Sequence, residues 1–261
     1  MISGRTLTIA AKEIRAFLSS PGFYIISFVS SALYGGLYYI QLMGFSKNLS
    51  ESVMRPGVPK EALNIQTSVF MQHLGVLNLM LLLIVPAFSM RLLSEEKKNR
   101  TFDLLMTSPV SSLDIVLGKF MAMCAVISIF MAIAISYPLL TTTFATVHWP
   151  SFFLSFGAIL ALGYLYSAID LFCSSLTESV FISFVISLLL NIFIWFVASG
   201  SQMVDSNLGR QIFEHISLGN HLGELVNGTV RTSSVVYIVS LLVLFVFLAE
   251  RVIESSRWRS T

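Results

Sequence analysis

A long stretch without formal charge constrains this sequence most. From Phe120 to Ile169 the chain contains no Asp, Glu, Lys or Arg. Only 11% of all residues are charged and 55% are hydrophobic, with a mean hydropathy of +0.81, whereas soluble domains carry about 25% charged residues. The net charge of +2 is too small to indicate a nucleic-acid partner. The sequence therefore predicts an all-α integral membrane protein in a lipid bilayer.

The uncharged stretch is too long for one crossing, because a helical span needs about 20 apolar residues. The break at His148-Trp149-Pro150 divides it into two spans. Four further apolar stretches complete six transmembrane helices in a single domain over residues 1–261. The predicted spans are residues 23–45, 69–92, 115–141, 151–172, 179–199 and 234–252.

Residues 5–19, ahead of the first span, predict an amphipathic helix. Its apolar face includes Ile14 and Phe17, and its polar face is basic, with Lys12 and Arg15. A helix of this kind lies in the headgroup plane of a membrane. Pro21-Gly22 then turns the chain into the first span.

The distribution of Lys and Arg predicts the orientation. With the N-terminus inside, 11 of the 16 basic residues fall on inner segments, as the positive-inside rule requires. Six crossings also place the C-terminus inside. We therefore expect a multi-pass membrane protein with both termini cytoplasmic. Residues 200–233 are then outside, and their two short amphipathic patterns predict a re-entrant or surface segment, with a solvated loop as the alternative.

The motifs of nucleotide and metal chemistry are missing from the sequence. Gly118-Lys119 is followed by Phe120 and preceded by Leu113 where a phosphate-binding loop begins with glycine, so no phosphate cradle is expected. The four histidines lack ligand spacing, and the two cysteines lie in separate apolar stretches. We therefore expect no catalytic, cofactor or metal site in this chain.

The loop of residues 94–110, between the second and third spans, combines dense charge with a short apolar stripe of Phe102, Leu105 and Met106. Ser111 and Asp114 after it predict a capping box that opens the third span. The stripe favours a short helix that docks into a groove on a cytoplasmic partner. A solvated loop held by surface ion pairs is equally compatible with the pattern.

The loop and the start of the third span contain the pairs Glu95-Glu96, Arg100-Thr101, Leu104-Leu105, Ser108-Pro109 and Gly118-Lys119. In these pairs the loop resembles that of ABC-2 type permease subunits of ATP-binding-cassette transporters. Three further segments resemble the same family: residues 12–21, 173–179 and 221–230. The overall likeness is closest to the gliding-motility-associated permeases. Arg100 departs from the family, which commonly has glycine there, and so does the carboxylate of Asp170. The resemblance also implies a location in a bacterial inner membrane.

The resemblance implies an ABC-2 (type V exporter-like) fold and a permease without ATPase activity of its own. Two copies of a separate ABC ATPase subunit, which bind ATP and Mg, would drive substrate export or force transmission. It also implies a second permease copy or paralogue and allows an auxiliary periplasmic or membrane protein. The substrate is not implied. The expected ATPase contacts are Glu95, Glu96, Arg100, Thr101, Phe102, Leu105 and Pro109, with Ser175, Thr177 and Glu178 as a smaller contact.

Two helix faces predict a dimer interface or transport pathway. Ser27, Ser31 and Gly35 recur every four residues and permit close helix approach. Ser187, Asn191 and Trp195 share a face of the fifth span, where Asn191 needs a hydrogen-bond partner; a partner within the same subunit is the open alternative. We interpret Asp170 as an interfacial charge that water reaches, with a proton- or ion-coupled role as the alternative. The competing function is a stand-alone secondary transporter or membrane scaffold.

Overall fold

The computed structural model describes residues 4–54, 64–144, 147–197, 218, 223 and 231–259. In these ranges every regular element is a helix, which confirms the all-α prediction. A short π-helical turn, Gln66–Phe70, leads into the third helix. The α-helices are α1 (Gly4–Ser19), α2 (Pro21–Met54), α3 (Met71–Ser89), α4 (Ser94–Lys98), α5 (Thr101–Thr107), α6 (Ser112–Thr141), α7 (Trp149–Leu176), α8 (Val180–Val197) and α11 (Thr232–Arg259).

Five stretches of described helix are long and apolar enough to cross a membrane. They are Pro21–Ser52, Ser68–Lys98, Ser112–Thr141, Trp149–Leu176 and Thr232–Ser256. The fifth predicted span corresponds to α8, which has 18 residues and extends about 27 Å at 1.5 Å per residue. That is slightly less than the roughly 30 Å of a hydrocarbon core. The membrane class is supported, whereas the count of six spans stays a prediction.

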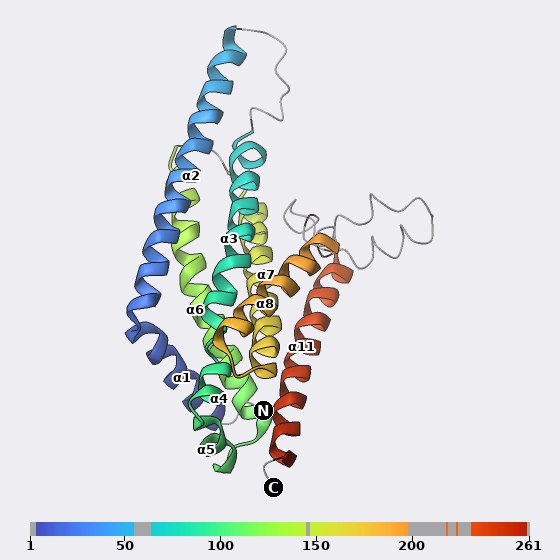
Figure 1. Cartoon of the computed structure of the whole chain (residues 1–261). Coiled ribbons are helices and arrows are strands. Elements are labelled where there is room, and N and C mark those ends of the chain that lie inside the picture. Colours follow the sequence, from blue (N-terminus) through green and yellow to red (C-terminus); the bar gives the residue numbers. More distant parts are fainter. Residues whose placement is uncertain are drawn as a thin grey trace.

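The long helices form an upright bundle, and α1 lies at an angle across one end of it (Figure 1). That end also holds α4, α5 and the C-terminal part of α11, and is called the basal end below. The helix α1 ends before Ser20, whose N–H still donates to the Phe17 carbonyl at 3.0 Å. The predicted helix over residues 5–19 is therefore confirmed as α1, which packs against α6.

The helix α7 lies at the centre of the bundle. It packs against α3, α6, α8 and α11. In its most apolar 18-residue stretch 67% is buried, compared with 22% in the corresponding stretch of α2 and 17% in that of α11. The apolar outer faces of α2 and α11 are therefore left for lipid or for another membrane protein. The predicted segment over residues 200–233 falls almost wholly outside the described residues.

Candidate functional site

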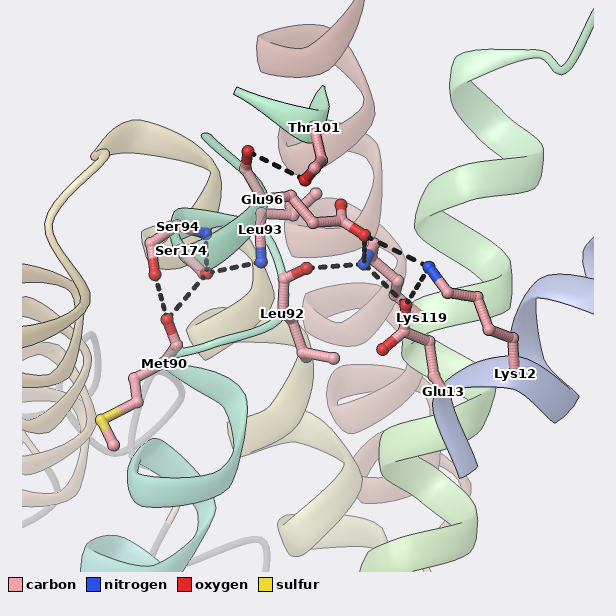
Figure 2. Close-up of polar contacts among 10 residues, drawn as sticks. All are labelled: Lys12, Glu13, Met90, Leu92, Leu93, Ser94, Glu96, Thr101, Lys119 and Ser174. Carbon is pink, nitrogen blue, oxygen red and sulfur yellow. Dashed lines mark hydrogen bonds and ion pairs between the residues drawn. The ribbon is translucent and has the colours of Figure 1, made fainter. Parts of the chain in front are cut away.

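A buried ammonium group organises the basal end. Lys119 of α6 is 1% exposed, and its Nζ lies 3.0 Å from Glu13 Oε1 of α1 and 2.9 Å from Glu96 Oε1 of α4. The same Nζ donates to the Leu92 carbonyl at 2.6 Å. Figure 2 shows these groups converging on one point. A buried charge requires compensation of this kind, so Lys119 fixes three segments to one another.

Lys12 completes the cluster from its open side. Its Nζ lies 3.8 Å from the Oε1 atoms of both Glu13 and Glu96, and its side chain is 69% exposed. Exposed ion pairs at such distances add little stability. The cluster therefore has a buried part around Lys119 and a solvated rim at Lys12 (Figure 2).

Gly118, the residue before Lys119, allows α1 to approach α6 closely. A Cβ atom at this position would lie 2.8 Å from Ile9 Cβ and 3.0 Å from the Thr6 carbonyl oxygen. Both distances are shorter than carbon contacts normally allow. The Gly118-Lys119 pair therefore has a structural role here: the glycine admits α1, and the lysine binds its Glu13.

The start of α4 is held by α7. Ser174 Oγ accepts hydrogen bonds from the backbone N–H groups of Leu93 at 3.1 Å and Ser94 at 3.2 Å (Figure 2). These N–H groups have no partner within α4, because the first turn of a helix leaves its donors free. Farther along α4, Lys97 Nζ donates to the Ser175 carbonyl at 2.5 Å. Both contacts bind the loop to the end of α7.

The backbone at the junction of α4 and α5 has a conformation that favours glycine. Arg100 has φ 57° and ψ 18°, a left-handed conformation, and it is the one described non-glycine residue with positive φ. Residues with a Cβ adopt this region at a cost of about 1–2 kcal/mol, whereas glycine does so freely. The glycine that is common here in the family suits this backbone better than Arg100 does.

The apolar side chains of α5 do not all face outward. Phe102 is only 5% exposed and lies under Lys97, whose Nζ is 5.3 Å from the ring centroid. Leu105 is half-buried against the core. Leu104, by contrast, is 71% exposed. We expected Phe102 and Leu105 to anchor a partner, but in the isolated chain they anchor α5 to its own bundle.

The other predicted ATPase contacts differ in accessibility. Glu95, Arg100, Thr101, Pro109 and Glu178 are exposed. The other five contacts are less accessible: Glu96 is partly buried in the Lys119 cluster, Leu105 and Thr177 are partly buried, Ser175 is fully buried, and Phe102 lies beneath Lys97. The structure thus presents an outward surface of Glu95, Arg100, Thr101, Leu104 and Pro109. Contact of all ten predicted residues with an ATPase stays a prediction.

The end of the loop is attached to α1 and capped as predicted. Ser111 Oγ accepts from the Asp114 N–H at 3.1 Å, and the Ser111 N–H donates to Asp114 Oδ2 at 3.3 Å, which confirms the capping box. Thr6 donates to Asp114 Oδ1 at 2.7 Å, and Arg5 Nη1 donates to the Pro109 carbonyl at 2.5 Å. Consequently α1 contacts both ends of the loop.

The small residues of α2 contact α6 of the same chain. Ser31 Oγ lies 2.7 Å from Tyr137 Oη, and a Cβ on Gly35 would lie 3.1 Å from Tyr137 Cε1. Ser27, the third residue of the stripe, is partly buried. The close helix approach that these residues permit is therefore made within the subunit, and their part in a dimer stays a prediction.

The polar residues of α8 face inward. Asn191 is fully buried, and its Nδ2 donates to Asp170 Oδ1 at 2.8 Å. This is the second of our two interpretations, a hydrogen bond within the subunit's own bundle. Ser187 is also fully buried, whereas Trp195 is 39% exposed. A contribution of these three residues to a dimer interface or pathway stays a prediction.

The burial of Asp170 contradicts our prediction from its position in the sequence. We expected an interfacial charge that water reaches, but its exposed fraction is 0%. It accepts from Asn191 and lies 2.9 Å from Ser89 Oγ. Sequence position alone missed this burial, because the covering residues come from α3 and α8, which are distant in the chain.

Comparison with known proteins assigns the chain to a family. The model of one family, ABC-2 family transporter protein, matches residues 7–250. No curated protein matches the chain. Since the family model covers nearly the whole chain, from α1 to α11, the chain belongs to the ABC-2 family of transporter proteins.

Proposed function

We propose that the chain is the permease subunit of an ABC transporter and transmits ATP-driven movement of a separate ATPase subunit to the membrane helices. The observation that carries this proposal is the exposed surface of α4 and α5 at the basal end. It presents Leu104, which is 71% exposed, on a support that buried polar contacts fix to α1, α6 and α7. A solvent-exposed leucine among charged residues suits a groove on a protein partner.

The contacts described above define a route for such movement. A force on α5 acts first on α4, whose Glu96 binds Lys119 of α6. Lys119 also binds Glu13 of α1, and Ser174 of α7 holds the start of α4. Closure of a pair of ATPase subunits would in this way move several helices together, because packed elements transmit displacement instead of absorbing it.

Six crossings are part of the proposal, with α8 as the fifth. Ser175 of α7 binds Lys97, and Ser112 donates to Glu254 near the end of α11, so both α7 and α11 end at the basal end. The chain must return to the opposite end between them, and α8 begins that return. Together with the Lys and Arg distribution, this supports a cytoplasmic basal end in a bacterial inner membrane.

The assembly that we propose contains two ATPase subunits and a second permease copy or paralogue. The exposed apolar faces of α2 and α11 support a membrane-embedded neighbour. They include Phe28 of α2, which is 76% exposed, and Val236 of α11, which is 61% exposed. A type V exporter-like arrangement, membership of the gliding-motility-associated group and an auxiliary protein remain further parts of this proposal, which rest on the likeness of short segments.

Substitution of Leu104 tests the proposed contact. Leu104→Asp places a charge at the centre of the expected interface and should weaken association with the ATPase subunit at least about tenfold, measured by co-purification from native membranes. The matched control is Leu49→Asp, because Leu49 is 46% exposed and lies near the end of α2 that is far from the basal end. Equal recovery of an ATP-binding subunit with both variants would contradict the contact.

A stand-alone secondary transporter is the second candidate. One observation favours it: the fully buried carboxyl group of Asp170, since ionisable residues inside membrane domains mark ion or proton pathways in such transporters. Co-purification separates the two candidates. If the chain is a secondary transporter, no ATP-binding subunit should co-purify with the wild-type protein.

A further inference from the structure

Asp170 lies at the junction of three helices. It is on α7, its Oδ2 lies 2.9 Å from Ser89 Oγ at the end of α3, and its Oδ1 accepts from Asn191 of α8 at 2.8 Å. All three residues are 0% exposed. Among the described residues, no cation forms an ion pair with Asp170. An isolated carboxylate in such surroundings is strongly disfavoured relative to the neutral acid.

The hydrogen-bond geometry of Ser89 is consistent with a proton on Asp170. Ser89 Oγ lies 2.5 Å from the Val85 carbonyl and 2.9 Å from Asp170 Oδ2. A hydroxyl group has a single hydrogen to donate, and the carbonyl of Val85 can only accept. If Ser89 donates to Val85, its contact with Asp170 is a hydrogen bond only when Asp170 Oδ2 carries a proton and donates it.

The remaining contacts around the carboxyl group agree with a neutral acid. A carboxylate offers about four acceptor positions, yet one N–H group, from Asn191 Nδ2, is the unambiguous donor to it. Ser187 Oγ, one turn earlier on α8, is buried beside the carboxyl group and interacts with it, although neither it nor Asn191 Oδ1 makes a hydrogen bond of standard geometry among the described residues. In the described part of the chain the neighbours of Asp170 are thus neutral hydroxyl and amide groups, and a fully buried carboxylate without a cation is disfavoured.

Among the residues that the structure describes, the groups around Asp170 provide no compensating charge. On α7 itself the titratable neighbours are Tyr166 and Cys173, which interact electrostatically with Asp170 and are neutral when protonated. The helix α3 contributes the hydroxyl of Ser89, and α8 contributes the amide of Asn191 and the hydroxyl of Ser187. Lys97, the cation bound to this end of α7, contacts the Ser175 carbonyl, five residues farther along the chain.

From this geometry we infer that Asp170 is a proton-binding site, and that its bound proton is required for α8 to dock against α3 and α7. Any movement that separates α8 from α3 and admits water breaks the Oδ2–H bond, transfers the proton to water and leaves a hydrated carboxylate. Return of α8 takes a proton up again. Because Ser174, one turn along α7, holds the start of α4, this junction lies directly beside the loop at the basal end.

The protonation state can be tested by infrared spectroscopy of the purified full chain at neutral pH. The C=O stretch of a protonated carboxyl group is separate from the amide and carboxylate bands and shifts in deuterated water. We expect such a band in the wild-type protein and its loss in Asp170→Asn. Absence of the band from the wild-type protein would overturn the inference without bearing on ATPase binding.

The link to helix docking can be tested by the pH dependence of thermal unfolding. At neutral pH, unfolding exposes Asp170 to water, where its carboxyl group releases the proton. The equilibrium constant for unfolding of the wild-type protein should therefore increase as pH rises above about 4, by up to tenfold per pH unit. Asp170→Asn retains a donor for Ser89 and an acceptor for Asn191, and its unfolding equilibrium should lack this dependence on pH. Parallel profiles of the two proteins would overturn the inference.

A neighbouring serine provides the control. Ser183 is fully buried on α8 and has no hydrogen-bond partner among the described residues, about 12 Å along the helix from Asn191. Ser183→Ala should keep the wild-type pH profile, and the same loss as in Asp170→Asn would count against a specific role of Asp170.

Stabilisation of the wild-type protein by Na⁺ at constant pH, lost in Asp170→Asn, would assign the site to a cation in place of a proton.

Discussion

At the residue scale, the basal end depends on the adjacent pair Gly118 and Lys119. The first residue has no side chain because α1 occupies that space, and the second carries a charge that is almost fully removed from water. A lysine so buried is stable because two carboxylates and a carbonyl surround its ammonium group. Removal of that charge therefore affects three segments at once.

Lys119→Met should lower the free energy of unfolding by about 3 kcal/mol, because it leaves two partly buried carboxylates without their cation. Glu13 and Glu96 retain side-chain exposures of 13% and 18%, so water relieves part of the penalty. Denaturation of the purified protein in detergent measures the change. Lys12→Met is the control and should change stability by less than about 1 kcal/mol. Similar losses in both variants would contradict a special role of the buried lysine.

Gly118→Ala should destabilise the protein by about 1–3 kcal/mol, the usual effect of excess volume in a packed interface. The added methyl group would meet the backbone of α1 at Thr6 as well as Ile9, so α1 must shift. Gly157→Ala in α7 is the control, since no atom lies within 4 Å of a Cβ there, and alanine is the better helix former. If thermal unfolding ranks Gly157→Ala as the more damaging change, the account of α1 packing is wrong.

At the element scale, α4 and α5 form a short arm that the bundle holds from three sides. Its start is bound by Ser174 of α7, and its ion pairs lead to α1 and α6. The sequence predicted a short helix in this loop and the capping box after it. It could not predict which way Phe102 points, because helical periodicity shows which residues share a face and not whether that face meets a partner or the chain's own core.

Ser174→Ala should loosen the arm without unfolding the bundle. It leaves the N–H groups of Leu93 and Ser94 without their acceptor, at a cost of about 1–3 kcal/mol. Hydrogen exchange at these two amides should become faster while exchange in the rest of α7 stays slow. Ser175→Ala is the control, because Ser175 Oγ donates only to the Phe172 carbonyl within its own helix. Unchanged exchange at Leu93 and Ser94 would contradict the assigned role of Ser174.

At the scale of the whole molecule, hydropathy located most of the membrane helices. The predicted span over residues 151–172, for example, lies within α7, Trp149–Leu176. Hydropathy could not pair Asp170 with Asn191, because that contact depends on how α7 and α8 pack after they have formed. The same limit applies to Ser31 and Gly35. Their spacing predicted close helix approach, but the structure identifies Tyr137 of the same chain as the group that approaches.

The basal end also unites segments that are far apart in the sequence. Arg5 and Thr6 of α1 contact Pro109 and Asp114, and Ser112 contacts Glu254. The N-terminal helix, the loop, the start of α6 and the end of the last helix are thus connected at the surface of the basal end. Our account assigns this surface to the cytoplasmic side, where it receives the movement of an ATP-hydrolysing partner.

The most direct test is photo-crosslinking in native membranes from position 104, where a benzoylphenylalanine would replace the exposed Leu104. The same substitution at Leu49, near the opposite end of α2, provides the reference. The account predicts that position 104, and not position 49, forms an adduct with a protein that mass spectrometry identifies as an ATP-binding-cassette subunit. An adduct of position 104 with a protein of the outer side, or adducts with the ATPase from position 49 alone, would contradict it.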